Sequence, residues 1–203
     1  PLRRQRQMCI RDSFYTTYGE SFIWERDGLV AYTYPNFRPT GLEFQGKSQG
    51  IAYGKRGDIL DAHIFKKGFF FTVEGQTVPN LSRSNGFVVL SYVNSILSQY
   101  TINLYTGQHK PSGYMELLPM PDYAIRQSDI ERIVNAIINI KRKWFSLDET
   151  NLEYHGLIAQ MELKGGIEAS LDKMQEQLTD DYARYVELVK ENDDLWMDLA
   201  DID

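Results

Sequence analysis

Apolar residues in the first third of the chain come in short runs that turn residues separate. The runs lie at 22–24, 29–32, 51–53, 59–65 and 69–73. Asp27-Gly28 stands between the first two runs, and this pair is a strong hairpin signal because the turn needs positive φ. Short strands with glycine and charged residues in their turns predict a small, twisted, mostly antiparallel sheet with bent or bulged strands.

A helical spacing follows from Asn85 onward. Apolar residues recur every three or four positions and fall on one face, at Phe87, Leu90, Val93, Leu97 and Tyr100. Ser84 or Asn85 is expected to cap this helix. The polar pair Asn94-Ser95 interrupts the run, and we expect it to bond neighbouring backbone and to fix the helix against the sheet.

Prolines mark the end of the next predicted element. Residues 114–118 read Tyr-Met-Glu-Leu-Leu and are followed by Pro119-Met120-Pro121. A residue before proline prefers an extended backbone, and proline cannot donate a ladder hydrogen bond. The pattern therefore predicts a short strand that stops at Pro119.

The following range is helical in pattern. Ser128 and Glu131 have the spacing of a capping box. An apolar stripe continues through Ile130, Ile133, Val134, Ile137, Ile138 and Trp144. The basic run 141–143 suits the C-terminal end of a helix dipole, and it could also touch DNA phosphate. A turn with a helix restart is expected at 147–150.

A second amphipathic helix is expected after Gly165-Gly166. Its apolar residues recur at helical spacing from Ile167 to Val189, with charged and amide residues between them. Such a helix is long enough to form a coiled-coil hairpin or to pack on another domain.

The elements together predict an α+β fold, in which a small twisted sheet packs on a helix and a helical C-terminal extension follows. We divide the chain into a terminal segment, a sheet-and-helix domain, a connecting helix with its turn, and an acidic helical tail. These ranges are 1–13, 14–125, 126–160 and 161–203.

The segment from Arg3 to Ser13 has a separate origin in our interpretation. It resembles the translation of an adapter that transposase-based sequencing libraries leave behind. The alternative is a natural basic arm that could touch nucleic acid. On the first interpretation the natural protein continues upstream and Cys9, the single cysteine, is not native. With no other cysteine, signal peptide or long apolar run, we expect a cytoplasmic protein without disulfides.

Charge is distributed unevenly along the chain, whose formal net charge is −6. Arg126 to Asp203 carry nine basic and eighteen acidic residues, whereas Arg38 to Lys110 carry eight basic and four acidic ones. The whole chain is a poor nucleic-acid binder by net charge, but its middle is locally basic. A DNA-binding surface would therefore have to be formed by the middle, with the acidic end facing elsewhere.

Several segments, taken in order, resemble one family. They are Phe37–Phe44 with Lys47–Gly50, Ala62–Gly68, the Leu90-x-x-x-Asn94-Ser95 helix with Tyr114-x-x-x-Leu118-Pro119-x-Pro121, and Ser146–Thr150. Together they resemble the target-recognition region of adenine-specific DNA methyltransferases, of the single-chain restriction–modification type (type IIG) and the related BREX phage-defence methylases. The resemblance covers about residues 20 to 155.

The resemblance implies a region that docks on double-stranded DNA and selects its sequence. We expect contacts from turn tips on one side of the sheet, where basic or amide side chains reach phosphates or base edges. Backbone N–H groups after Ser82 could hold a phosphate. The candidates are Lys47, Ser48, Gln49, Lys55, Arg56, Arg83, Gln108, His109 and Lys110. Each could equally be an ordinary solvated loop residue.

Motifs of a catalytic centre are missing from the sequence. It has no GxGxxG, no GxxxxGK[ST] and no Asp/Asn-Pro-Pro-Tyr motif, with which an adenine methyltransferase holds the flipped base. His63, His109 and His155 lack the spacing of metal ligands. We expect no catalytic residue, metal or cofactor in this chain. The resemblance implies that S-adenosylmethionine serves an upstream methyltransferase domain of the same parent chain, which methylates adenine N6.

Two other functions fit the same residues. A non-enzymatic DNA specificity subunit would pair with a separate methylase through its helices. A protein-binding α+β module with a coiled-coil tail would have no role with nucleic acid, and its partner would bind residues 161–203. Neither function involves a membrane.

Overall fold

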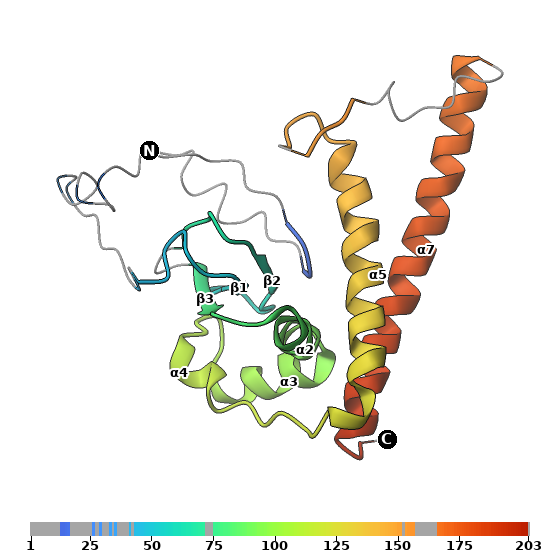
Figure 1. Ribbon diagram of the computed structural model, residues 1–203. Coiled ribbons are helices and arrows are strands. Elements are labelled where there is room, and N and C mark those ends of the chain that lie inside the picture. Colours follow the sequence, from blue (N-terminus) through green and yellow to red (C-terminus); the bar gives the residue numbers. More distant parts are fainter. Residues whose placement is uncertain are drawn as a thin grey trace.

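The computed structural model describes residues 13–16, 26, 29, 33, 35, 41, 43–71, 75–151, 153–156 and 166–202. The fold is α+β, with a three-stranded antiparallel sheet followed by helices (Figure 1). The elements in chain order are β1 (Gly50–Gly54), β2 (His63–Phe65), β3 (Gly75–Pro79), α2 (Arg83–Val93), α3 (Ile96–Tyr105), α4 (Ser112–Met115), η3 (Ala124–Arg126), α5 (Gln127–Ser146) and α7 (Ile167–Leu199).

Strand β1 is the centre of the sheet, which has the order β2-β1-β3. Gly50 is paired with Phe65 of β2 and with Pro79 of β3, so the start of β1 and the ends of both neighbours lie together. A Cβ atom at Gly50 would lie 1.9 Å from the Val78 carbonyl oxygen, so the close approach of β1 and β3 requires glycine there.

The strands after β1 differ from the prediction. Only His63–Phe65 of the predicted strand 59–65 is a strand, and the third strand of the sheet is Gly75–Pro79. Of the predicted strand 69–73, residues 69–71 are not in a strand and 72–73 lie outside the described residues. Phe71 is held by a side chain: its N–H donates to Gln45 Oε1 at 3.0 Å, and Gln45 Nε2 donates to its carbonyl at 2.9 Å. These bonds occupy the groups that a ladder would use. The predicted hairpin at Asp27-Gly28 lies outside the described residues.

The chain forms two helices where one central helix was predicted, so the prediction of a single helix was wrong. Helix α2 ends at Val93, and Ser95 caps α3 by accepting from the Ser98 N–H at 3.3 Å. The Asn94-Ser95 pair does bond backbone and link the helix to the sheet, as expected. The cap of α2 is Ser82, which accepts from the Asn85 N–H at 3.2 Å, in place of the predicted Ser84 or Asn85.

Two further local predictions were wrong. The predicted strand 114–118 is the short helix α4, which ends at Met115, and a turn; the helix therefore ends before the prolines are reached. The predicted capping box of Ser128 and Glu131 does not form, because the Glu131 carboxylate accepts hydrogen bonds from Ser84 and Gln127. That carboxylate thereby links the start of α5 to α2. The turn at 147–150 is present, but the predicted helix restart is not seen in the described residues that follow it, 151 and 153–156.

The helices α5 and α7 run side by side, with α7 on the side of α5 away from the sheet (Figure 1). The predicted apolar stripe of α5 is confirmed, since Ile130, Ile133, Val134 and Ile137 are fully buried. Leu188, Leu195 and Trp196 of α7 join them in the same hydrophobic core as α2 and β1. The described residues therefore form one core that reaches from the sheet to the C-terminal half of α7.

None of the helices in the described part of the chain has both the length and the apolar character that a membrane crossing requires.

Candidate nucleic-acid interface

A cleft of about 410 Å³ opens between the sheet, the start of α2 and one face of α5. We call it the basic cleft, because Lys66, Lys67, Arg83 and Arg142 line it and no acidic residue of the described chain does. Apolar side chains such as Ile64, Leu81 and Ile138 form its floor. A cavity of this size lies within the usual range of about 300–1,000 Å³ for small-ligand sites.

The register of the sheet places the two lysines in this cleft. Residues 66 and 67 follow directly after β2, at the end of the sheet where β1 begins. Helix α2 starts at the same end, because β3 finishes opposite Gly50. The N-terminus of a helix favours an anion through its unpaired N–H groups. The turn after β2, the start of α2 and the positive charge of the two lysines therefore lie at the same end of the sheet.

Helix α5 supplies the opposite wall. Asn135, Asn139 and Arg142 line the cleft from this helix. They stand four and three residues apart, so they lie on one face of α5, beside the stripe that the helix buries. Asn135 holds its position by donating from Nδ2 to the Glu131 carbonyl at 2.8 Å.

Two arginines of the cleft are held by neutral groups. Arg83 Nη2 donates to Asn135 Oδ1 at 2.9 Å, and its guanidinium lies 5.3 Å from the Phe87 ring centroid. The Arg142 guanidinium lies 5.1 Å from the Tyr15 ring centroid. Such contacts orient a guanidinium without cancelling its charge, because the partner carries none. The charge of Arg142 nevertheless helps to lower the pKa of Glu153, and the charge of Arg83 helps to lower the pKa of Glu131.

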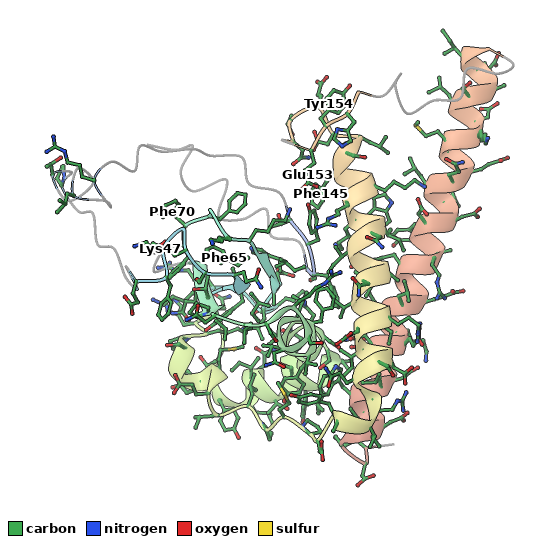
Figure 2. All side chains as sticks on the ribbon, in the orientation of Figure 1. Lys47, Phe65, Phe70, Phe145, Glu153 and Tyr154 are labelled. Atoms are coloured by element: carbon green, nitrogen blue, oxygen red, sulfur yellow. The ribbon has the colours of Figure 1, made fainter. Side chains whose placement is uncertain are left out.

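Lys66 differs, since a carboxylate neutralises it. Its Nζ donates at 3.0 Å to Glu153 Oε1 and at 3.0 Å to the Tyr15 hydroxyl, which itself bonds Glu153. Burial alone lowers the pKa of Lys66, but these hydrogen bonds outweigh burial and raise it. Burial alone raises the pKa of Glu153, but the same bonds, with charges that include Arg142, lower it. Figure 2 shows Glu153 and Phe145 beside the C-terminal end of α5.

The structure brings only part of the predicted DNA-binding set to the basic cleft. Gln49 and Arg83 line it. Lys47 is exposed in the turn before β1 and does not line the cleft; Figure 2 shows it well apart from α5. Lys67 is exposed and has no hydrogen bond or ion pair among the described residues.

A second group of predicted residues lies at the other end of β1. The Lys110 N–H donates to the Lys55 carbonyl at 2.7 Å, the Gly57 N–H donates to the Gln108 carbonyl at 2.9 Å, and Arg56 and His109 form an isolated bridge. We call 55–57 with 108–110 the loop group. It lies roughly 13 Å from the basic cleft along β1, since a strand rises about 3.3 Å per residue.

Two predicted DNA-binding side chains are buried, and this corrects their expected role. Ser48 is buried, and its hydroxyl donates to the Phe44 carbonyl at 3.1 Å. Lys110 is 0% exposed, and its Nζ donates to the carbonyls of Gly57 and Gly107. Burial lowers the pKa of Lys110, although the charge of Asp58 opposes the shift. Both side chains hold turns together, and neither reaches the surface.

The residues that sequence reasoning missed come mainly from α5. Sequence reasoning named neither Asn135 nor Asn139, and it placed Arg142 in a basic run that suits the helix dipole or a DNA phosphate. A signal was available, because two amides and a guanidinium four and three residues apart, next to an apolar stripe, mark a face that borders the core. The local sequence pattern does not predict that the basic turn of the sheet lies opposite this face.

Comparison of the chain with models of protein families and with curated proteins finds no match. Within the described ranges, no three His, Cys, Asp or Glu side chains lie close enough together to hold a metal ion.

Proposed function

We propose that this chain is the target-recognition region of an adenine-specific DNA methyltransferase of a restriction–modification or BREX-type phage-defence system. The resemblance of its ordered segments supports the proposal, and so does the basic cleft. The observation that carries it is one of charge. The chain has a net charge of −6, yet four basic and no acidic side chains of the described chain line one cleft.

Duplex DNA suits such a surface. It carries about one negative charge per 1.7 Å of helix axis, so cations that meet phosphates release counterions and gain affinity. Lys67 and Arg83 offer donors at the mouth of the cleft, and the start of α2 adds the positive end of a helix dipole. The loop group, with Lys55 and Arg56, would supply a second contact on the same duplex, because roughly 13 Å is less than half a helical turn.

In this proposal, two parts of the parent enzyme have different tasks. This chain would dock the duplex and select the sequence, while the upstream methyltransferase domain would bind S-adenosylmethionine and methylate adenine N6. Gln49 and Asn139 are the exposed amides of the cleft, and an amide can pair with the edge of adenine. Such an enzyme would act in the cytoplasm, where bacterial DNA lies.

Fluorescence anisotropy of a labelled duplex, measured over a salt series, tests the proposal. Three double charge reversals are compared: K67E/R83E in the basic cleft, K55E/R56E in the loop group, and R184E/K190E on α7. The last pair is the matched control, because it makes the same charge change on exposed residues of the acidic helix. A mixture of random duplexes avoids the need to know the recognised sequence.

We expect both interface variants to weaken binding at least tenfold at 100 mM salt. Each lost phosphate contact should also reduce the slope of log K against log salt by about 0.9. The control should keep the slope of the unmodified chain. Absence of duplex binding at 50 mM salt would contradict the proposal, and an unchanged slope in K55E/R56E would remove the loop group from the interface.

A helix-mediated subunit or protein-binding module is the second candidate, and α7 favours it. This helix has 33 residues and α5 has 20, so α7 is about 20 Å longer at 1.5 Å per residue. Lys143, near the end of α5, pairs with Asp181, so the N-terminal turns of α7 extend past α5. Ile167 and Leu171 in those turns are 69% and 45% exposed.

Light scattering of the full chain separates the candidates. If α7 pairs with a second helix, the chain should dimerise, and L171E should return it to a monomer while A169E, one of its exposed neighbours, should not. A dimer that binds no duplex at low salt would favour the protein-binding module. A monomer that binds duplex would favour target recognition.

A further inference from the structure

The basic cleft has the features of a site for one nucleotide, beyond a surface that follows a phosphate backbone. It is a half-open hollow of about 410 Å³, whereas contact with phosphates alone needs only protruding cations. Its lining combines a cationic rim, an apolar floor and amide side chains. Phosphate, sugar–base body and base edge are the groups that would match these three parts.

The cationic side chains of the basic cleft suit a phosphate. Arg83 and Arg142 are oriented by Asn135 and by the rings of Phe87 and Tyr15, although the charges of Glu131 and Glu153 also act on them. Lys67 is exposed and unpaired among the described residues. Guanidinium groups bind phosphate through paired N–H donors, and their prior orientation reduces the entropy lost on binding.

The walls suit a base. The side-chain amide of Asn139 has no hydrogen bond to any described residue, and the side-chain amide of Gln49 makes only a long bond, at 3.4 Å, to the Leu81 carbonyl. Both amides can donate and accept, which is what the edge of a base requires. Between them lie the apolar side chains of Ile64, Leu81 and Ile138, against which the faces of a base can pack.

We propose that the basic cleft binds a single nucleoside monophosphate unit, with its phosphate between Lys67, Arg83 and Arg142 and its base toward Gln49 and Asn139. The unit could be part of DNA or a free nucleotide, since both carry the same groups. The inference therefore goes beyond duplex docking and does not depend on it.

Isothermal titration of the full chain with deoxyadenosine monophosphate tests this site. Deoxyadenosine and inorganic phosphate are titrated in parallel, because each carries only one half of the expected ligand. The variant K67E changes an exposed side chain that has no hydrogen bond or ion pair in the described chain, so it should fold normally. N139L removes the base-edge amide at an exposed position, and K190E, which makes the same charge change on α7 and does not line the cleft, is the matched control.

We expect the monophosphate to bind at least tenfold more tightly than either half, with a tenfold or greater loss in K67E, a smaller loss in N139L and no change in K190E. Equal binding of inorganic phosphate would overturn the proposal, as would an affinity that K67E leaves unchanged or no binding at 10 mM nucleotide. Duplex that displaces the nucleotide would identify DNA as its source, and failure to displace it would identify a free nucleotide. If duplex binds but the nucleotide does not, this inference fails while the docking proposal stands.

Discussion

The side-chain amide of Asn94 satisfies both backbone polar groups of Ala62. The Ala62 N–H donates to Asn94 Oδ1 at 3.0 Å, and Asn94 Nδ2 donates to the Ala62 carbonyl at 2.8 Å and to the Leu90 carbonyl at 3.0 Å. Ala62 is fully buried just before β2; its carbonyl also accepts from the Phe14 N–H at 2.6 Å, whereas its N–H bonds only Asn94 among the described residues. One amide thus joins the break between α2 and α3 to the sheet.

Asn94→Leu should lower the free energy of unfolding by about 1–3 kcal/mol. The substitution leaves the buried Ala62 N–H without a partner, which costs about 1–3 kcal/mol, while the Ala62 carbonyl keeps its bond from the Phe14 N–H. Urea unfolding followed by circular dichroism measures the change. Asn103→Leu is the control, because that exposed amide makes one bond, at 3.2 Å to the Asp58 carbonyl, and should cost about 0.5 kcal/mol or less. Equal losses of unfolding free energy in the two variants would show that the Asn94 bonds contribute no more to stability than the single exposed bond of Asn103.

Truncation of the Ser91 side chain should lower the stability of the chain, because this residue connects α2 to α7. Its hydroxyl bonds Asn192 Oδ1 and accepts from Trp196 Nε1 at 2.8 Å, and its carbonyl accepts from Asn192 Nδ2 at 3.1 Å. We expect Ser91→Ala to destabilise the chain by about 2–4 kcal/mol, since the buried indole N–H loses its acceptor.

Ser98→Ala provides the matched control for Ser91. Ser98 is equally buried, but its hydroxyl has no hydrogen-bond partner within the described structure. Removing an unsatisfied buried hydroxyl should leave stability unchanged or raise it by about 1 kcal/mol. Chemical denaturation of both variants would contradict the assignment if Ser98→Ala proved the more damaging of the two.

Lys110→Met should reduce stability without changing the electrostatics of DNA binding. The buried ammonium holds the Gly57 and Gly107 carbonyls, so its removal should cost about 1–3 kcal/mol. The slope of log K against log salt for duplex binding should stay constant. The neighbouring Lys55→Met should instead keep its stability and lose about 0.9 in that slope. A slope that falls in Lys110→Met would mean that the loop opens and this lysine meets a phosphate.

The link between Lys66 and Glu153 should make stability depend on pH. The lowered pKa of Glu153 means that its contribution is present above the unfolded value of 4.5 and is lost as the pH falls through the lowered one. The raised pKa of Lys66 means that its contribution is present below 10.5 and is lost as the pH rises through the raised value. The full effect therefore lies between roughly pH 5 and pH 10.

Glu153→Gln tests this window through its melting temperature. Because both side chains are about a third exposed, solvent screening limits the loss at pH 7 to about 0.5–1 kcal/mol. The difference from the unmodified chain should shrink toward zero as the pH falls below 4. Glu149→Gln makes the same change at an exposed position of the same turn and should show no such dependence. A difference that persists at pH 3 would mean that packing, and not charge, explains the effect.

Long amphipathic patterns were predictable because they are repeated many times. The stripe of α5 and the spacing of α7 each contain several turns, so one ambiguous residue changes little. The predictions of short elements were wrong for the opposite reason, because their patterns are repeated only a few times. Residues 69–73 are as apolar as a strand, but the Gln45 amide occupies the backbone of Phe71, and this contact joins positions that are distant in sequence.

The candidate site was partly visible in the sequence. Basic residues in turns and at the start of α2 pointed to Gln49 and Arg83, and both line the basic cleft. The same reasoning named Lys110, whose exposure depends on how one loop closes over another. Loop residues look alike in sequence whether they face solvent or a neighbouring turn.

The sequence by itself determined the α+β class, the two long helices and the separation of a basic middle from an acidic end, because composition and periodicity are properties of the chain alone. Only the tertiary structure decided which basic residues meet. The antiparallel register brings the turn after β2 beside the start of α2, and the α5 face that carries Asn135, Asn139 and Arg142 lies opposite them. A cleft is formed by surfaces from separate elements, and no local pattern specifies how far apart they fold.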